Sequence, residues 1–138
     1  MKIQPEFPLL DISVKDWNSE EVLGLIEYNG IMPGVSQKVF EDHHLNRILV
    51  DGNGYVFKIT GKELIAAWRK FVPFFVPIYR YVFEYQNKQI SFDEVKEYMA
   101  NGLNSLDYKE GDDNTDLKDR LNQCHTIRDV IKQYSIRW

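Results

Sequence analysis

The amino-acid sequence predicts an α+β fold, in which a small antiparallel sheet of three to five strands packs against two to four helices. The first supporting observation is a hairpin signal over residues 47–60. The second is a run of alternating residues over 78–85, which lies between two segments of helical periodicity. The chain has 138 residues, of which 43% are hydrophobic and 28% charged, so we expect one globular domain over residues 1–138.

The hairpin prediction depends on its turn. Residues 47–50 and 55–59 are both rich in β-branched and aromatic side chains, and the sequence Asp-Gly-Asn-Gly lies between them at 51–54. Asp-Gly and Asn-Gly pairs favour hairpin turns because these turns need backbone φ angles above zero. The two segments should therefore form adjacent antiparallel strands.

Residues 71–85 form the most apolar and aromatic stretch of the chain. From residue 78 onward the side chains alternate, which predicts a central strand over 78–85, followed by a turn at 86–88 into residues 89 and 90. One side of this strand is aromatic and consists of Tyr79, Tyr81, Phe83 and Tyr85. The other side consists of Ile78, Arg80, Val82 and Glu84. We expect the aromatic side to pack under helices as core, with a partly exposed binding surface as the alternative.

Capping residues and apolar spacing mark helical segments over 18–30, 60–72, 91–103, 117–124 and 126–134. Gly30 and Gly102 are expected to end the first and third of these helices, since glycine readily adopts the left-handed conformation. Val72 should end the second, because Pro73 disfavours helical geometry in the residue before it.

Three other segments have weaker patterns. Residues 35–40 have the composition of a short strand, and residues 107–116 have that of an exposed acidic loop. Residues 136–138 are expected to form an edge strand at the end of the chain.

The histidines and the single cysteine do not form a metal-binding pattern. His43 and His44 are adjacent, and adjacent side chains point in different directions on a regular element. Neither His-x-x-x-His nor Cys-x-x-Cys occurs in the chain. Cys124 and His125 are sequence neighbours, which rarely align as nucleophile and base, and the spacing of Cys124 from Leu121 predicts a small core residue. We therefore expect no metal ion and no cofactor.

Charge is distributed unevenly along the chain. The formal net charge is −4, yet residues 91–119 contain nine acidic and three basic side chains. A surface that binds phosphates needs the opposite sign, so we expect no direct contact with nucleic acid. The simplest interpretation of this acidic segment is a solvated face, but its density of acids also suits docking of a basic protein.

Other features predict a cytoplasmic protein. Cys124 is the single cysteine, which excludes an internal disulfide and suits a reducing compartment. The N-terminal residues include a lysine and two prolines where a secretory signal would need an apolar core. The longest apolar run, 71–79, is too short to span a bilayer, so we expect no contact with a membrane.

Together these features predict a non-enzymatic protein-binding inhibitor. Single-domain, acidic chains without a catalytic signature have the general character of immunity proteins, which neutralise bacterial toxins. The expected partner is a basic toxin domain, for example the active site of a nuclease. Tyr98 would supply an aromatic anchor. The acidic contacts would come from Asp107, Glu110, Asp112, Asp113, Asp116 and Asp119.

Two alternatives remain open. In the first, the protein is an enzyme of unrecognised type in which His43 or His44 acts as general base beside Glu41 or Asp42. This alternative predicts a concave pocket that contains a histidine and a positioned carboxylate. In the second, the protein is a structural or adaptor module that dimerises through residues 79–85 or the terminal strand. The sequence itself favours no particular oligomeric state.

Overall fold

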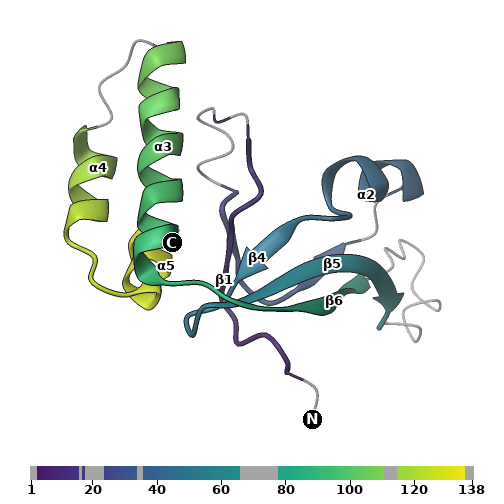
Figure 1. The fold of residues 1–138 in the computed structure, drawn as a ribbon. Helices are drawn as coiled ribbons and strands as arrows, with labels where there is room; N and C mark the ends of the chain where they lie inside the picture. The colour runs from purple at the N-terminus through teal and green to yellow at the C-terminus, as the bar shows by residue number, and fades with distance from the viewer. Residues whose placement is uncertain are drawn as a thin grey trace.

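The computed structural model describes residues 3–15, 17, 24–33, 36–65, 78–110 and 115–135, and it confirms the α+β fold (Figure 1). These residues form one six-stranded antiparallel sheet and four helices, so the sheet exceeds the predicted three to five strands. The elements in chain order are β1 (Leu9–Asp11), β2 (Ile26–Glu27), β3 (Ile31–Pro33), α2 (Gln37–His43), β4 (Ile48–Val50), β5 (Tyr55–Leu64), β6 (Ile78–Gln89), α3 (Phe92–Glu110), α4 (Thr115–Asn122) and α5 (Ile127–Tyr134).

The strand order in the sheet is β2-β1-β4-β5-β6-β3. The predicted hairpin is confirmed as β4 and β5. Asp51 in its turn is fully buried, and its Oδ1 atom accepts the backbone N–H groups of Asn53 (2.9 Å) and Tyr55 (3.1 Å). Gly54 has a φ of +88°, which residues with side chains rarely adopt. The residues that predicted the turn are therefore those that form it.

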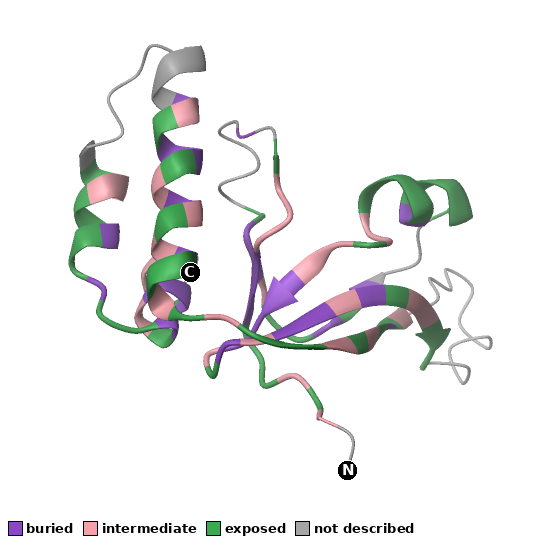
Figure 2. Ribbon diagram, viewed as in Figure 1, coloured by how far each residue is buried: buried purple, intermediate pink, exposed green. Residues whose placement is uncertain are grey.

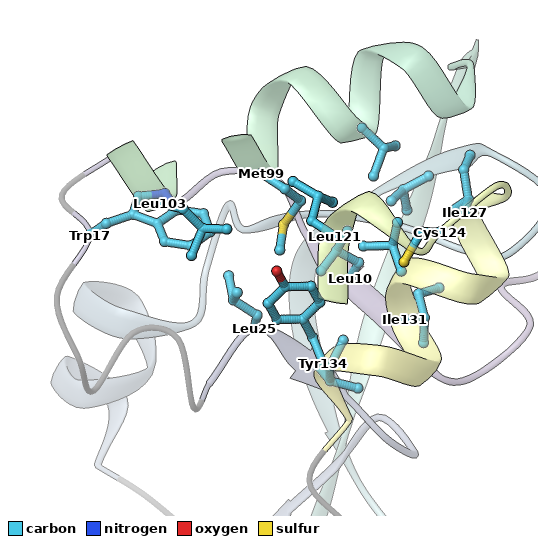
Figure 3. Close-up of a cluster of buried hydrophobic side chains, with 14 of the residues drawn as sticks. Leu10, Trp17, Leu25, Met99, Leu103, Leu121, Cys124, Ile127, Ile131 and Tyr134 are labelled. Atoms are coloured by element: carbon cyan, nitrogen blue, oxygen red, sulfur yellow. The ribbon is translucent and has the colours of Figure 1, made fainter. Parts of the chain in front are cut away.

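The sheet separates two hydrophobic clusters, because successive strand residues point to opposite faces. In β1, Leu10 belongs to a cluster with α3, α4 and α5, which we name the helical cluster (Figure 3). Leu9 belongs to the other, which includes Phe40 of α2 and is named the α2 cluster. In β4, Val50 belongs to the helical cluster and Leu49 to the α2 cluster. Figure 2 shows these strands as the buried centre of the molecule.

The C-terminal helices agree with their predicted caps. The Oγ atom of Ser91 accepts the backbone N–H of Glu94 (3.2 Å) before α3. Thr126 and Asp129 form a reciprocal capping box at the start of α5. The helix predicted over 117–124 is confirmed as α4, which begins two residues earlier and ends two residues earlier, at Asn122. Local chemistry was sufficient to locate all three helices.

Gly102 does not end α3, which continues for eight further residues to Glu110. A Cβ atom at position 102 would overlap the indole ring of Trp17, which is 2% exposed. Figure 3 shows Trp17 and Leu103 within the helical cluster. Glycine at this position therefore makes room for a packed tryptophan inside a continuous helix.

Two predictions in the first third of the chain are wrong. Residues 26 and 27 were expected within a helix over 18–30 but form β2, and Gly30 (φ +71°) makes the turn into β3. Residues 35–40 were expected as a strand, but α2 begins at Gln37. Its N-cap is Ser36, whose Oγ atom accepts the backbone N–H of Val39 (3.1 Å).

The region of β5 and β6 also differs from the prediction. Residues 60–64 were expected to begin a helix over 60–72 but continue β5, because residues 61–64 pair with 79–82 of β6. β6 extends to Gln89, so there is no reversal at 86–88. Asn87 instead has a φ of +52°, at an irregularity in the β5–β6 register.

The core interpretation of the aromatic side of β6 is confirmed at its centre. Tyr81 is 5% exposed and belongs to the α2 cluster, against which Tyr79 and Phe83 pack. The helix in this cluster is α2, and not the predicted helices at 60–72 and 91–103.

Several predictions fall on residues outside the described ranges. They are the start of the first helix at 18–23, the helix end and apolar connection at 66–77, the centre of the acidic loop at 111–114 and the terminal strand at 136–138. The flanks of the expected acidic loop are helical, since residues 107–110 lie in α3 and residues 115 and 116 lie in α4. No helix in the described part of the chain is long and apolar enough to cross a membrane.

Candidate functional site

Four of the six predicted acidic positions lie at one end of the α3–α4 pair. α3 ends at Glu110, α4 begins at Thr115, and the two helices stand side by side (Figure 1). Residues 107 and 110 belong to the last turn of α3, whereas Asp116 and Asp119 belong to the first turns of α4. Because the end of α3 and the start of α4 lie at the same end of the pair, residues 107, 110, 116 and 119 occupy one corner of the described structure. We name it the acidic corner.

Asp116 and Asp119 are both exposed at this corner. The Asp116 side chain is 80% exposed and pairs with Arg120 one turn later, at 3.1 Å. Exposed pairs of this kind hold their side chains only weakly, so the Asp116 carboxylate remains able to bind another cation. The opposite side of α4 carries Leu121, which is 3% exposed in the helical cluster. Asp112 and Asp113 lie outside the described residues.

Tyr98, the predicted anchor, is engaged within the protein. Its hydroxyl donates to the carbonyl oxygen of Val14 (3.1 Å) and accepts the backbone N–H of the same residue (3.0 Å). Its ring packs edge-on against Trp17, with ring centroids 5.8 Å apart. Tyr98 thus ties α3 to the segment after β1. The structure does not bring it together with the acidic corner, which lies at the C-terminal end of α3.

A second candidate site is an open cleft of about 450 Å³ beside β1 and α2. We name it the Arg47 cleft, after the guanidinium at its floor. It is lined by Asp11, Ser13, Val14, Lys15, Gly24, Asp42, His43 and Arg47.

An ion pair joins Arg47 to β1 at the floor of this cleft. The Nε atom of Arg47 lies 2.8 Å from Oδ2 of Asp11, whose side chain is 5% exposed. The other oxygen of Asp11 accepts both the backbone N–H and the hydroxyl of Ser13, at 2.7 and 2.6 Å. Asp11 is therefore fully engaged and has little capacity to bind a ligand. Arg47 is 36 residues away from Asp11 in the sequence, so no spacing pattern predicted this ion pair.

The charged groups around Arg47 shift one another's pKa values. Burial alone would lower the pKa of Arg47, but Asp11, with smaller contributions from Tyr81 and Glu27, raises it overall, so the guanidinium stays charged. Burial raises the pKa of Glu27, and Arg47 offsets this only in part. Oε2 of Glu27 lies 3.9 Å from Nη1 of Arg47. The cluster is consistent with a structural ion network.

The two histidines have different surroundings. His43 is exposed and lines the cleft together with Asp42, but no hydrogen bond joins it to a carboxylate of the described residues. His44 is half-buried, and its Nδ1 atom lies 2.8 Å from the hydroxyl of Tyr81. The cleft thus supplies the concavity that a general base would need, but no carboxylate of the described residues is hydrogen-bonded to either histidine ring. An enzymatic role stays a prediction.

Cys124 is confirmed as a core residue. It is 2% exposed and lies in the helical cluster near Leu121 and Ile127 (Figure 3). Its Sγ atom contacts the carbonyl oxygen of Arg120 at 3.2 Å, and burial raises the pKa of the thiol. These properties disfavour the thiolate that a nucleophile requires. The described residues contain no group of three histidine, cysteine or acidic side chains placed to hold a metal ion.

Comparison with known proteins identifies no relative: no family model, no curated protein and no solved structure matches this chain. Function must therefore be argued from the two candidate sites themselves.

Proposed function

We propose that the protein is a non-enzymatic binding protein, an immunity-type inhibitor that neutralises a basic bacterial toxin domain through the acidic corner. The observation that carries this proposal is the exposure of Asp116 and Asp119 on a helix whose opposite side is held in the core. Residues 107 and 110, in the last turn of α3, add two further acidic positions to the same corner.

Packing supports the proposal because it fixes α4 before any partner binds. Leu121 is buried in the helical cluster, and Leu117 packs against that cluster. The hydroxyl of Tyr134 in α5 donates to the carbonyl oxygen of Leu117 at 2.6 Å. A surface that is already ordered loses less conformational entropy when it binds, so more of the contact energy appears as affinity.

Electrostatics define the kind of partner. Acidic residues concentrated at one corner steer a basic surface toward it and hold it after contact. The active site of a nuclease is basic because it binds phosphates, which makes such a domain the best-matched toxin. The same acidic charge disfavours direct contact with nucleic acid. The single cysteine suits a reducing compartment, so we expect the inhibitor to act in the cytoplasm.

A charge-reversal experiment tests the proposal. The partner is sought as the product of a neighbouring toxin-like reading frame, or by capture from the native host, and its association is measured at low and high salt. In the test variant, Asp112→Lys, Asp113→Lys and Asp116→Lys are combined. We expect its association rate at low salt to fall by roughly tenfold or more, since electrostatic steering accounts for 10- to 1000-fold in such rates.

The matched control reverses three exposed acids at the opposite end of α3: Asp93→Lys, Glu94→Lys and Glu97→Lys. It changes the net charge by the same amount, so a similar loss in both variants would indicate only a general charge effect. An unchanged rate for the test variant would exclude the acidic corner as the binding site.

A further inference from the structure

One face of the β3–β6–β5 region is turned away from the α2 cluster. The strand register places three side chains side by side across this face, with Arg80 of β6 directly opposite Ile31 of β3 and Glu63 of β5. Next along β6, Val82 is opposite Gly61, which has no side chain to cover it. We name this the outer face. Figure 1 shows α2 above β5 and β6, and α3 to α5 gathered to one side of the sheet.

The outer face exposes apolar side chains. Ile31 is 44% exposed and Val82 is 38% exposed. Ile65 is 37% exposed and continues the same row as Glu63, since its backbone N–H donates to the carbonyl oxygen of Ile78 (3.0 Å). Scattered exposed apolar residues are ordinary, but strand pairing gathers these on one surface.

A hollow of about 350 Å³ lies beside these residues. Its lining includes Pro5, Phe7 (40% exposed), Arg80 and Val82. Such a hollow can receive an apolar side chain from a facing surface, which is how interface anchors are buried.

Charge indicates which partner fits. Glu63 and Arg80 form an ion pair at 2.9 Å near the middle of the outer face, with side chains 54% and 58% exposed. The pair has no net charge, whereas the chain as a whole carries −4, so like-charge repulsion does not oppose contact here. A two-fold axis beside this pair would bring Arg80 of each copy against Glu63 of the other, and no charge would be left unpaired.

We propose that the outer face is a self-association surface and that its occupant is a second copy of this chain. The apolar residues supply the buried area, and the exchanged Glu63–Arg80 contacts set the orientation. From sequence, dimerisation through residues 79–85 or the terminal strand was one of the alternatives. Because the aromatic side of β6 packs in the α2 cluster, the contact uses its opposite side. The inference is independent of the acidic corner.

Sedimentation equilibrium of the full chain tests the proposal. We expect a monomer–dimer equilibrium, and Val82→Arg should raise the dimer dissociation constant by roughly 10- to 100-fold, as for an anchor near the centre of an interface. The control is Val39→Arg on α2, which changes a valine of similar exposure (39%) outside the outer face and should leave the constant unchanged. A wild-type chain that stays monomeric at millimolar concentration would overturn the proposal.

A mixing experiment distinguishes self-association from a merely intramolecular role of the ion pair. Glu63→Arg gives an outer face with two positive charges, and Arg80→Glu gives one with two negative charges. Each variant alone should be monomeric, while an equimolar mixture should form heterodimers. If the mixture sediments as monomers while the wild type dimerises, Glu63 and Arg80 do not meet across the contact and the proposed orientation is wrong.

Discussion

The Nδ1 atom of His44 lies 2.8 Å from the hydroxyl oxygen of Tyr81, and this contact joins the C-terminal end of α2 to β6. Burial lowers the pKa of His44 below its ordinary value of 6.5, and Arg47, His43 and Lys62 lower it further. His44 is therefore neutral at pH 7. Its protonation would place a positive charge beside other cations at the edge of the α2 cluster.

This contact predicts pH-dependent stability. Because the pKa of His44 is lower in the folded state, the unfolded chain binds more protons as the pH falls below 6.5, and folding loses free energy there. Denaturant unfolding between about pH 7.5 and about pH 5.5 should show this decline, and His44→Gln should reduce the slope. Glu27 acts in the opposite sense from pH 4.5 upward, since its pKa is raised, so the comparison must be between variants. His43→Gln removes one of the lesser causes of the lowered His44 pKa, so it should reduce the slope less than His44→Gln does.

Removing one partner of the ion pair at the floor of the Arg47 cleft should be strongly destabilising. Asp11→Ala leaves the largely buried Arg47 guanidinium without its closest carboxylate and should cost about 3 to 5 kcal/mol of unfolding free energy. The double variant Asp11→Leu and Arg47→Met removes both charges and should cost less than Asp11→Ala alone. Urea unfolding of both variants checks this. A double variant that is less stable than the single one would mean that packing, and not charge, dominates.

Gly102→Ala should destabilise the protein although alanine is the better helix former. The gain in helix propensity is about 1 kcal/mol, while the clash of the new methyl group with Trp17 should cost about 1 to 3 kcal/mol. Trp17→Leu creates space at the same point, so the two substitutions together should be less destabilising than the sum of their separate effects. Thermal unfolding of the three variants measures this coupling.

Two threonines with the same sequence pattern should respond differently to alanine. Thr126→Ala removes the capping box of α5 and should cost about 1 kcal/mol. Thr60 also precedes an acidic residue by three positions, but it lies exposed in β5. Thr60→Ala should change stability by less than about 0.5 kcal/mol. Equal losses at both sites would contradict the assignment of β5 through residue 64.

The comparison of these threonines also shows which parts of the fold could be predicted from sequence. Thr126 and Thr60 both fit a capping pattern, and Thr126 precedes Ile127 and Val130, which pack in the helical cluster. After Thr60 the chain pairs with residues 79–82 of β6, and this long-range pairing overrides the local signal. The hairpin at 47–60 was predictable because its turn depends on residues that are adjacent in sequence.

In the candidate sites too, features formed by residues close in sequence were predictable, and those formed by distant residues were not. The acidic corner was visible from sequence because its residues lie within one segment of 13 positions, 107–119. His44 and Tyr81 are 37 residues apart in the sequence, so no spacing pattern relates them. Tyr98 has helical spacing suited to the core and also the chemistry of an anchor, and only its hydrogen bonds to Val14 distinguish the two roles.

The sheet that separates the two hydrophobic clusters also couples their stability. β4 contributes Val50 to the helical cluster and Leu49 to the α2 cluster, so neither side can open without weakening the other. The amide hydrogens of this strand should therefore exchange with solvent only through global unfolding. A protein that binds the acidic corner would slow exchange at Leu49 although it never approaches α2, because ligand binding stabilises the whole cooperative unit. Slower amide exchange far from the acidic corner would then show that the partner is bound, and not that the partner lies nearby.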